Sequence, residues 1–205
     1  MKIGILGAGN IGGNLGKLWA ETGHEVFFAV RSPQSDKVQA ILNSITANFH
    51  TGTIEEAVTF ADVILLSIHW QNVPEILTQI QDIITDKILI DSTNRMIPPP
   101  ADTTGSAAGD IARLLPTAKI IKAFNTLGAN NLTNLQFGAE NASTFICGDD
   151  TEAKSIVTQL AQEIGFDVVD VGLLNTAPLI ESLAKLWVQI SRQYGRETAF
   201  KLLKR

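Results

Sequence analysis

Three glycines near the start of the chain, Gly7, Gly9 and Gly12, have the spacing GxGxxG. They follow the apolar stretch 3–6 and open an amphipathic stretch, so they would lie in a turn between a strand and a helix. Glycines there permit a tight turn and let the backbone approach a pyrophosphate, while the N–H groups and dipole of the helix face the anion. The pattern predicts a dinucleotide site; the alternative is a purely structural turn. The residues expected to bind are Gly7, Ala8, Gly9, Asn10, Ile11 and Gly12.

The end of the second apolar stretch indicates which dinucleotide would bind. NAD-binding turns commonly have an Asp or Glu about 20 residues beyond the glycines, where it accepts hydrogen bonds from the ribose 2′-hydroxyl. This chain instead reads "FFAVRS", which puts Arg31 and Ser32 at that position, with Lys37 farther on. A guanidinium can bind the 2′-phosphate of NADP with two charge-assisted hydrogen bonds. We therefore expect NADP(H), held by Arg31 and Ser32; the alternative is that Arg31 is a solvated arginine at the end of a strand.

A third group of candidates lies in "LLSIHWQNVPE", where a strand ending near Ser67 gives way to a helix. Ser67, Ile68, His69 and Trp70 would lie at the carboxyl edge of the sheet, where open α/β sheets bind ligands. Ser67 and Ile68 are expected to contact the nucleotide, and His69 and Trp70 the nicotinamide and substrate. His69 is the candidate catalytic residue, because a histidine can supply a proton to a substrate; the alternative is a polar pocket residue.

Two further strand ends carry amides and a hydroxyl. Asn125 and Thr126 follow the strand in "IIKAFNTLGANNL", and Asn94 follows the strand in "ILIDSTN". These side chains could orient a carboxamide or a substrate carbonyl at the same edge of the sheet. Asn125 and Thr126 could equally cap a helix that starts near Gly128. Hydride transfer depends on positioning more than on a nucleophile, so the lack of a nucleophilic triad does not oppose an oxidoreductase.

Short apolar stretches alternate with longer amphipathic ones, which is typical of βαβ units on a parallel sheet. We expect strands over 2–6, 25–30, 62–67, 87–91, 119–123, 143–147 and 166–170, with a weak strand over 46–50. Helices are expected over 11–22, 33–43, 54–60, 151–164 and 177–194, the second capped by Ser32 with Pro33 at its first position. The fold class is α/β, a Rossmann-type, doubly wound, mainly parallel sheet with a C-terminal strand and helix extension.

Two other segments each allow two interpretations. The stretch 92–110 contains three consecutive prolines and is expected to be a long loop, either a functional lid or a surface insertion. In the last predicted helix, apolar residues recur at helical spacing and would form core or a subunit interface. A homodimer through this stripe is one interpretation. The stripe consists of Leu179, Leu183, Leu186 and Ile190.

Composition excludes several classes of protein. The 205 residues suit one domain, or a nucleotide-binding core over 1–123 and an extension over 124–205 that borders the acceptor cleft. The net charge is -5, with no basic stripe, so nucleic acid is not expected as a partner. The single cysteine and the histidine spacing predict neither a disulfide nor a metal site. The sequence lacks a secretory signal and a long apolar run, so we expect a cytoplasmic protein without a membrane partner.

These motifs in order, with "VRSPQSDK", "SIHWQNV", "KAFNTLGA", "CGDD" and "LLNTAPLIESL", extend over the whole chain. The chain resembles the coenzyme F420-dependent NADP oxidoreductase family, whose nucleotide half is similar to pyrroline-5-carboxylate reductases and STEAP metalloreductases. The resemblance implies NADPH held by the first two loops and a deazaflavin docked against the nicotinamide. His69 stands where the archaeal members usually have a proline, and Asn125 matches a pocket histidine. Only one basic residue is adjacent at the 2′-phosphate position.

The main functional hypothesis is an NADPH-dependent oxidoreductase that passes hydride to a planar small-molecule acceptor such as coenzyme F420 or a flavin. One alternative is a non-catalytic NADPH-binding sensor or partner module. Another is an imine reductase that resembles pyrroline-5-carboxylate reductase, although those enzymes carry a longer helical dimerisation domain. The first hypothesis predicts turnover with flavin-like carriers, whereas the second predicts binding without turnover.

Overall fold

The computed structural model describes residues 1–30, 34–47, 49–95 and 105–205. The strands are β1 (Lys2–Leu6), β2 (Glu25–Ala29), β3 (Phe49–Gly52), β4 (Val63–Leu66), β5 (Ile88–Asp91), β6 (Lys119–Lys122), β7 (Gln136–Phe137), β8 (Glu140–Asn141), β9 (Ser143–Gly148) and β10 (Asp167–Asp170). The helices are α1 (Asn10–Glu21), α2 (Asp36–Leu42), α3 (Ile54–Phe60), α4 (Val73–Ile80), α5 (Ala107–Leu114), α6 (Thr151–Glu163) and α7 (Ala177–Tyr194). Short 3-10 turns are η1 (Trp70–Asn72), η2 (Ala129–Thr133) and η3 (Leu174–Thr176).

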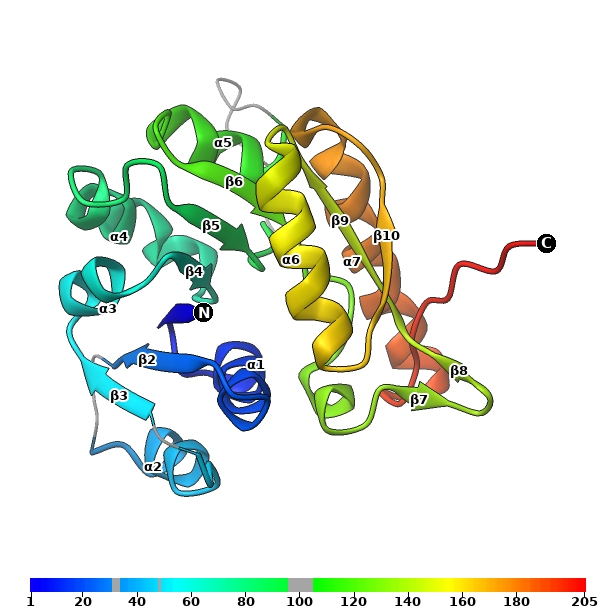
Figure 1. Ribbon diagram of the computed structural model, residues 1–205. Coiled ribbons are helices and arrows are strands. Elements are labelled where there is room, and N and C mark those ends of the chain that lie inside the picture. The colour runs from blue at the N-terminus through cyan, green and yellow to red at the C-terminus, as the bar shows by residue number, and fades with distance from the viewer. Residues whose placement is uncertain (31–33, 48, 96–104) are drawn as a thin grey trace.

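Eight strands form one sheet in the order β10-β9-β6-β5-β4-β1-β2-β3 (Figure 1). The six strands from β3 to β6 are parallel and have the order 3-2-1-4-5-6 of a doubly wound dinucleotide-binding sheet. The order in which strands are added to the sheet reverses between β1 and β4. Ligands bind such sheets at the carboxyl ends of the strands near this switch point. The predicted fold class is therefore confirmed.

Helices cover both faces of the sheet. One apolar core joins the sheet to α1, α2 and α6 through residues such as Leu15, Leu42 and Leu160. A second core on the opposite face joins it to α3, α4, α5 and α7, with Val58 and Ile111 among its members. Burial on both faces explains why the central strands read as continuous apolar runs. In the described part of the chain, no helix is long and apolar enough to cross a membrane.

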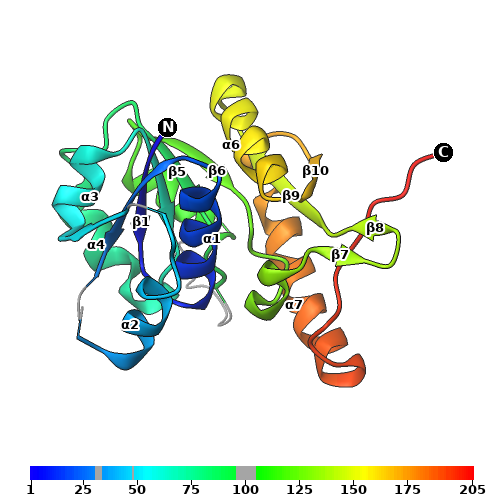
Figure 2. The ribbon, with the colours of Figure 1, turned by 60° about the horizontal axis from the view of Figure 1, so that its bottom comes forward.

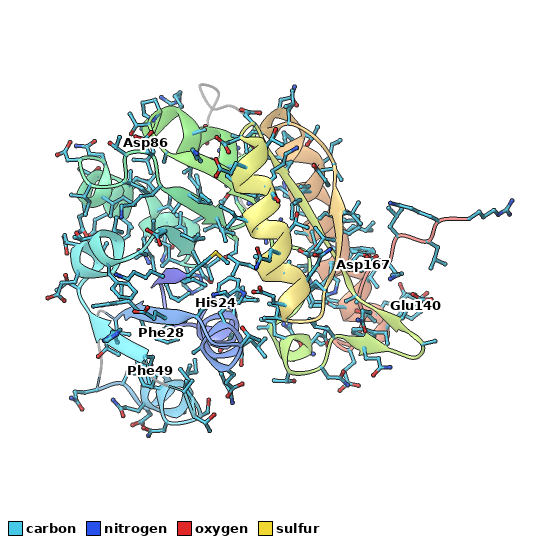
Figure 3. All side chains as sticks on the ribbon, viewed as in Figure 1. His24, Phe28, Phe49, Asp86, Glu140 and Asp167 are labelled. Carbon is cyan, nitrogen blue, oxygen red and sulfur yellow. The ribbon has the colours of Figure 1, made fainter. Side chains whose placement is uncertain are left out.

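The second half of the chain extends the sheet. β9 is antiparallel to β6, and β10 is parallel to β9. Figure 2 shows α6, α7, β9 and β10 together on one side of the molecule and β1 to β5 on the other. The C-terminal segment runs past Glu140 of the β7–β8 hairpin and Asp167 of β10 (Figure 3). Lys201 Nζ is 3.2 Å from Glu140 Oε2 and 3.1 Å from Asp167 Oδ2, which ties this segment to the extension.

Local sequence explains most helix starts. Thr53 and Glu56 form a reciprocal capping box at α3, and Asp150 caps α6 by accepting a hydrogen bond from the Ala153 N–H at 2.8 Å. Ser106 caps α5 in the same way. Each side chain satisfies an N–H group that has no partner inside its helix. The capping residues therefore determine where these helices begin.

Three expectations about elements were wrong in detail. The second helix begins at Asp36 with Ser35 as its cap, rather than at the predicted cap Ser32 and Pro33, which lie outside the described residues. The weak strand occupies Phe49–Gly52 instead of 46–50, because its register with β2 is set by pairs from Val26–Phe49 onward. The expected loop over 92–110 extends too far, because α5 begins at Ala107 with Ser106 as its N-cap.

The apolar stripe of α7 does not belong to the core. Its residues are exposed or half-buried, and the exposed fractions are 71% for Leu179 and 50% for Leu186. The buried face of α7 is rotated from this stripe and includes Ala184 and Trp187. The core alternative was therefore wrong.

Candidate functional site

The glycine turn connects β1 to α1 with no room for larger residues at two of its positions. Gly7 has a φ of +107°, and a Cβ there would lie 2.4 Å from the Ser67 carbonyl oxygen. A Cβ on Gly12 would lie 2.2 Å from the Gly7 carbonyl oxygen. By contrast, a Cβ on Gly9 would meet no protein atom within 4 Å. Gly9 therefore borders open space, which is the place where a phosphate group could approach the backbone.

The first turn of α1 faces this open space. Gly9 is the N-cap residue, and no side chain of the described residues forms a cap hydrogen bond there. Free N–H groups and the positive end of the helix dipole make such a terminus an anion site. The turn thus has the geometry and the electrostatics that a pyrophosphate requires.

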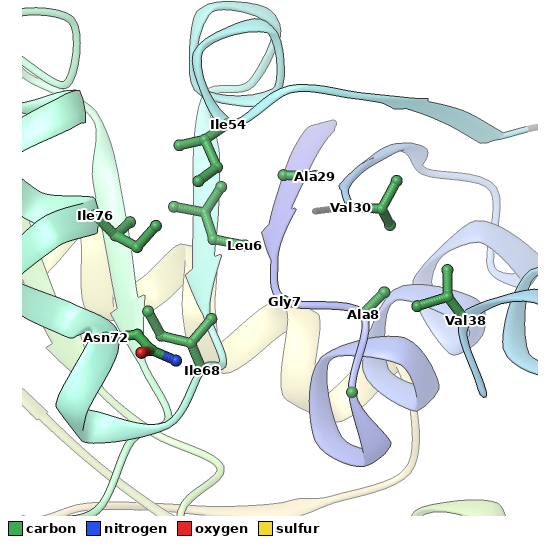
Figure 4. Close-up of a pocket in the computed structure, with 11 residues that line it drawn as sticks. Leu6, Gly7, Ala8, Ala29, Val30, Val38, Ile54, Ile68, Asn72 and Ile76 are labelled. Carbon is green, nitrogen blue, oxygen red and sulfur yellow. The ribbon is translucent and has the colours of Figure 1, made fainter. Parts of the chain in front are cut away.

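An apolar groove of about 300 Å³ lies on one side of the glycine turn (Figure 4). Leu6, Ile54, Ile68 and Ile76 form one wall, and the other wall consists of Ala8, Ala29, Val30 and Val38. Asn72 is the one lining residue with a polar side chain among those described. Apolar walls with few polar groups suit a flat aromatic ring such as adenine.

A second, more polar cavity of about 500 Å³ begins at the same turn. It shares Gly7, Gly9, Ile68 and Asn72 with the apolar groove. Its remaining lining residues come from the carboxyl ends of parallel strands and from the start of α1: Asn10, Ile11, Ser67, His69, Trp70, Ser92, Thr93 and Asn94. The two cavities meet at the glycine turn, so one elongated ligand with a central anionic group could occupy both.

The histidine and the tryptophan predicted for the substrate side both line the polar cavity. His69 is exposed and is the N-cap residue of the turn η1, and its carbonyl oxygen accepts a hydrogen bond from the Asn72 N–H at 2.9 Å. Trp70 is half-buried, and the guanidinium carbon of Arg95 lies 5.6 Å from its ring centroid. Arg95 is itself held by Asp110 at 2.5 Å. The Trp70 ring is thus in contact with a guanidinium that is itself fixed by Asp110. His69, by contrast, has access to the cavity and to solvent.

The two predicted asparagines form a reciprocal pair. Asn94 Nδ2 donates to the Asn125 carbonyl oxygen, and Asn125 Nδ2 donates to Asn94 Oδ1, both at 2.9 Å. Asn94 lines the polar cavity, but Asn125 and Thr126 are buried and are not among its lining residues. Asn125 therefore acts on the cavity through Asn94. Its Oδ1 is buried without a hydrogen-bond partner in the described part of the chain.

The alternative role of Asn125 and Thr126 as helix caps was wrong. The turn η2 has Gly128 as its N-cap residue and no side-chain cap. The Asn125 side chain points instead to Asn94 and, at 3.5 Å, to the Ile180 carbonyl oxygen of α7. The pair Asn94–Asn125 therefore joins the ends of β5 and β6 to α7.

Sequence reasoning missed a buried charge cluster behind the polar cavity. Lys122 Nζ lies 2.9 Å from Asp91 Oδ2 and 3.3 Å from Glu181 Oε1, and it also donates to the Thr93 carbonyl oxygen. Lys122 and Asp91 are fully buried, and Glu181 is 4% exposed. Asp91 Oδ1 accepts hydrogen bonds from the N–H and hydroxyl of Thr93 at 2.8 and 2.7 Å. The cluster fixes the backbone at Thr93, which lines the cavity.

Glu181 extends this cluster to a helix start. Its Oε1 accepts hydrogen bonds from the Ala107 and Ala108 N–H groups at 2.7 and 3.3 Å, at the N-terminus of α5. The only signal in the sequence was Lys122 inside the otherwise apolar "KIIKAF". A lysine in a central strand requires a buried acidic partner. The sequence does not say which carboxylates supply it.

Other candidates for chemistry are limited. Burial raises the pKa of the Cys147 thiol, so the reactive thiolate is disfavoured. Among residues 1–30, 34–47, 49–95 and 105–205, no cluster of potential metal ligands occurs. Arg31 and Ser32 lie outside the described residues, as does the side chain of Lys37. Binding of the 2′-phosphate by Arg31 and Ser32 thus stays a prediction.

Comparison with known proteins agrees with this geometry. Residues 2–95 match the family described as "NADP oxidoreductase coenzyme F420-dependent". An F420-dependent NADP reductase of Methanothermobacter thermautotrophicus is 27% identical, over 93% of this chain and 89% of that protein. The chain is therefore similar to F420-dependent NADP oxidoreductases in residues 2–95 and, at lower identity, over most of its length.

A solved structure and a relative that is much longer than this chain complete the comparison. The solved structure is described as a putative F420-dependent NADP reductase of Arthrobacter sp. FB24. It is 26% identical to this chain and superposes with a TM-score of 0.89 over the full length of both chains. The metalloreductase STEAP3 of Rattus norvegicus is 30% identical over 89% of this chain, but the chain spans only 36% of that protein's length. The likeness to STEAP3 therefore concerns one part of a larger protein.

Proposed function

We propose that this protein belongs to the F420-dependent NADP oxidoreductase family and is an NADPH-dependent oxidoreductase that transfers hydride between NADP(H) and a planar small-molecule acceptor such as coenzyme F420 or a flavin. The observation that carries the proposal is the glycine turn, which joins an apolar groove to a polar cavity at the positive end of α1. This arrangement fits a dinucleotide with the pyrophosphate at its centre. The name of the Methanothermobacter relative supports F420 as the acceptor.

In this proposal the nucleotide extends across both cavities. The backbone of Gly7 to Gly12 binds the pyrophosphate, the apolar groove holds the adenine, and the nicotinamide lies near Ser67, Ile68 and Asn94 in the polar cavity. Residues 1–123 hold the nucleotide, and residues 124–205 border the acceptor. The bound nicotinamide supplies or receives the hydride, and the walls of the cavity hold the two reacting rings together and exclude water.

His69 is the candidate for proton exchange with the acceptor. It lines the polar cavity and is exposed, so it can reach both the acceptor and solvent. An imidazole could donate or accept the proton that accompanies hydride transfer. Trp70, supported by Arg95, supplies an aromatic wall on which a planar acceptor could stack.

The preference for NADP(H) rests on Arg31 and Ser32. Arg31→Asp should raise the Kd for NADPH by about 30-fold or more, because a charge-assisted bond is replaced by repulsion. NADH, which lacks the 2′-phosphate, should be affected much less. Fluorescence titration with both nucleotides tests this, with Arg113→Asp as a control of equal charge change on the exposed end of α5. An unchanged affinity of the Arg31 variant for NADPH would disprove this phosphate site.

We propose further that two copies associate through the apolar stripe of α7. The stripe of Leu179, Leu183, Leu186 and Ile190 is exposed or half-buried and contains no charge, and exposed apolar patches often mark interfaces. Light scattering after size exclusion should give a dimer for the wild type and a monomer for Leu186→Lys. A monomeric wild type would contradict this proposal.

The low cysteine count supports a cytoplasmic location.

A further inference from the structure

A third cavity, of about 520 Å³, lies on the flank of α1 that faces the turn η2. Its lining residues are Asn10, Asn14, Ala129, Asn130, Thr133 and Arg196. Amides, a hydroxyl and a guanidinium line it, and no carboxylate of the described residues does. Asn10 also lines the polar cavity, so this residue at the start of α1 borders both spaces. We call this third cavity the amide recess.

Arg196 is held in position at the edge of the recess. Its guanidinium carbon lies 5.5 Å from the ring centroid of Trp187. Its carbonyl oxygen accepts hydrogen bonds from Asn130 Nδ2 at 3.2 Å and from Asn131 Nδ2 at 2.9 Å. Trp187 Nε1 donates to the Thr198 carbonyl oxygen at 2.8 Å, so the ring that supports Arg196 is itself fixed. These contacts order the segment that carries the guanidinium without using its N–H groups.

The guanidinium of Arg196 forms no ion pair with any carboxylate in the described part of the chain. This is notable in a protein whose net charge is -5. A guanidinium recognises phosphate and carboxylate groups through paired hydrogen bonds. The Asn130 amide donates to Asn131 Oδ1 and to the Arg196 carbonyl oxygen, and the Asn14 amide donates to the Asn10 carbonyl oxygen, so the guanidinium is the main donor in the recess. The amide recess therefore has the chemistry of a site for an anionic group.

We propose that the amide recess binds the anionic side-chain group of the hydride acceptor, a phosphate on a flavin-like or deazaflavin-like molecule. The inference rests on the proposed function, because it places the ring of the acceptor in the polar cavity. Asn10 marks where the side chain of the acceptor would pass from one space to the other. The recess would thus select acceptors that carry a phosphate over neutral ones.

FMN and riboflavin test the proposal, because they share one ring system and differ in the phosphate. Binding of each is measured by flavin fluorescence in the presence of saturating NADP⁺, which prevents turnover. The wild type should bind FMN about tenfold more tightly than riboflavin, as expected for one charge-assisted contact. Arg196→Gln should abolish this preference and leave the Kd for riboflavin unchanged. Inorganic phosphate should weaken FMN binding, but not riboflavin binding, to the wild type.

Two more variants separate the recess from general charge effects. Arg192→Gln removes an equal charge from an exposed residue of the last turn of α7 that does not line the recess, and it should leave the preference for FMN intact. Asn14→Asp adds a carboxylate to the recess and should weaken FMN binding selectively. The proposal is overturned if the wild type shows no preference for FMN or binds neither flavin, or if Arg192→Gln acts like Arg196→Gln.

Titration of the same proteins with NADPH distinguishes failure of this inference from failure of the proposed function. A wild type that binds NADPH but does not prefer FMN overturns the recess alone. A wild type that fails to bind NADPH contradicts the proposed function itself. Arg196→Gln should retain the wild-type affinity for NADPH, because Arg196 lines neither the apolar groove nor the polar cavity.

Discussion

Lys122→Met tests whether the buried charge cluster determines the stability of the cavity wall. The substitution keeps an apolar chain of similar length but removes the ammonium that lies 2.9 Å from Asp91 and 3.3 Å from Glu181. Both carboxylates stay buried, so they must be protonated or hydrated at a cost. Breaking a buried pair in this way typically costs about 3–5 kcal/mol. That loss is a large part of the ~5–15 kcal/mol that stabilises an ordinary domain.

The same strand provides a matched control. Lys119 Nζ lies 3.3 Å from Asp150 Oδ2, but both side chains are about one-third exposed. Lys119→Met should therefore cost less than about 1 kcal/mol, as expected for a surface pair. Urea unfolding followed by circular dichroism measures the free energy of unfolding of both variants. Equal losses in the two variants, or a loss below about 1 kcal/mol for Lys122→Met, would refute the assignment of a stabilising role to the buried cluster.

Three further predictions concern the site and the α6 cap. Gly9→Ala should leave the free energy of unfolding unchanged but raise the Kd for NADPH at least about tenfold, because its Cβ meets no protein atom and enters the pyrophosphate space. Gly12→Ala should lower both NADPH affinity and stability, because its Cβ meets the protein backbone. Equal effects of the two variants on stability would contradict this account. His69→Ala should lower acceptor turnover and leave the Kd for NADPH unchanged in stopped-flow assays, and the reverse would put His69 in the nucleotide site. The hydrogen bond from the Ala153 N–H lowers the pKa of Asp150, so Asp150→Ala should cost about 1 kcal/mol at neutral pH in urea unfolding. This difference should shrink as the pH falls below the ordinary aspartate pKa of about 4. It should vanish below the lowered pKa, because Asp150 is then protonated in both the folded and the unfolded state.

The fold could be predicted because local patterns and global topology agree. The helices Ile54–Phe60 and Ala177–Tyr194 begin and end where the sequence predicts. Errors occurred where two residues offered the same local chemistry. Both Ser32 and Ser35 could cap the second helix, and the structure uses Ser35. The start of α5 was missed because its cap, Ser106, lies in a stretch rich in Gly, Pro and Thr.

The site could be predicted only in part, because spacing along the chain does not determine packing. The glycine turn and the cavity positions of His69 and Asn94 follow from strand ends meeting at one edge of a parallel sheet. The contact of Lys122 with Glu181 joins residues far apart in the sequence, and no local pattern predicts it. Helical spacing likewise identified the stripe of α7, but not which face of α7 packs against the sheet.

The most direct test of the central claim is fluorescence titration of the wild-type protein with NADPH and NADH, followed in the same cuvette by F420 and then FMN. The proposed function predicts that NADPH binds more tightly than NADH and that a carrier oxidises the bound NADPH, seen as loss of absorbance of the reduced nicotinamide. Tight binding of NADPH without oxidation by either carrier would contradict hydride transfer to a flavin-like acceptor. Equal binding of the two nucleotides would contradict the preference for NADP(H).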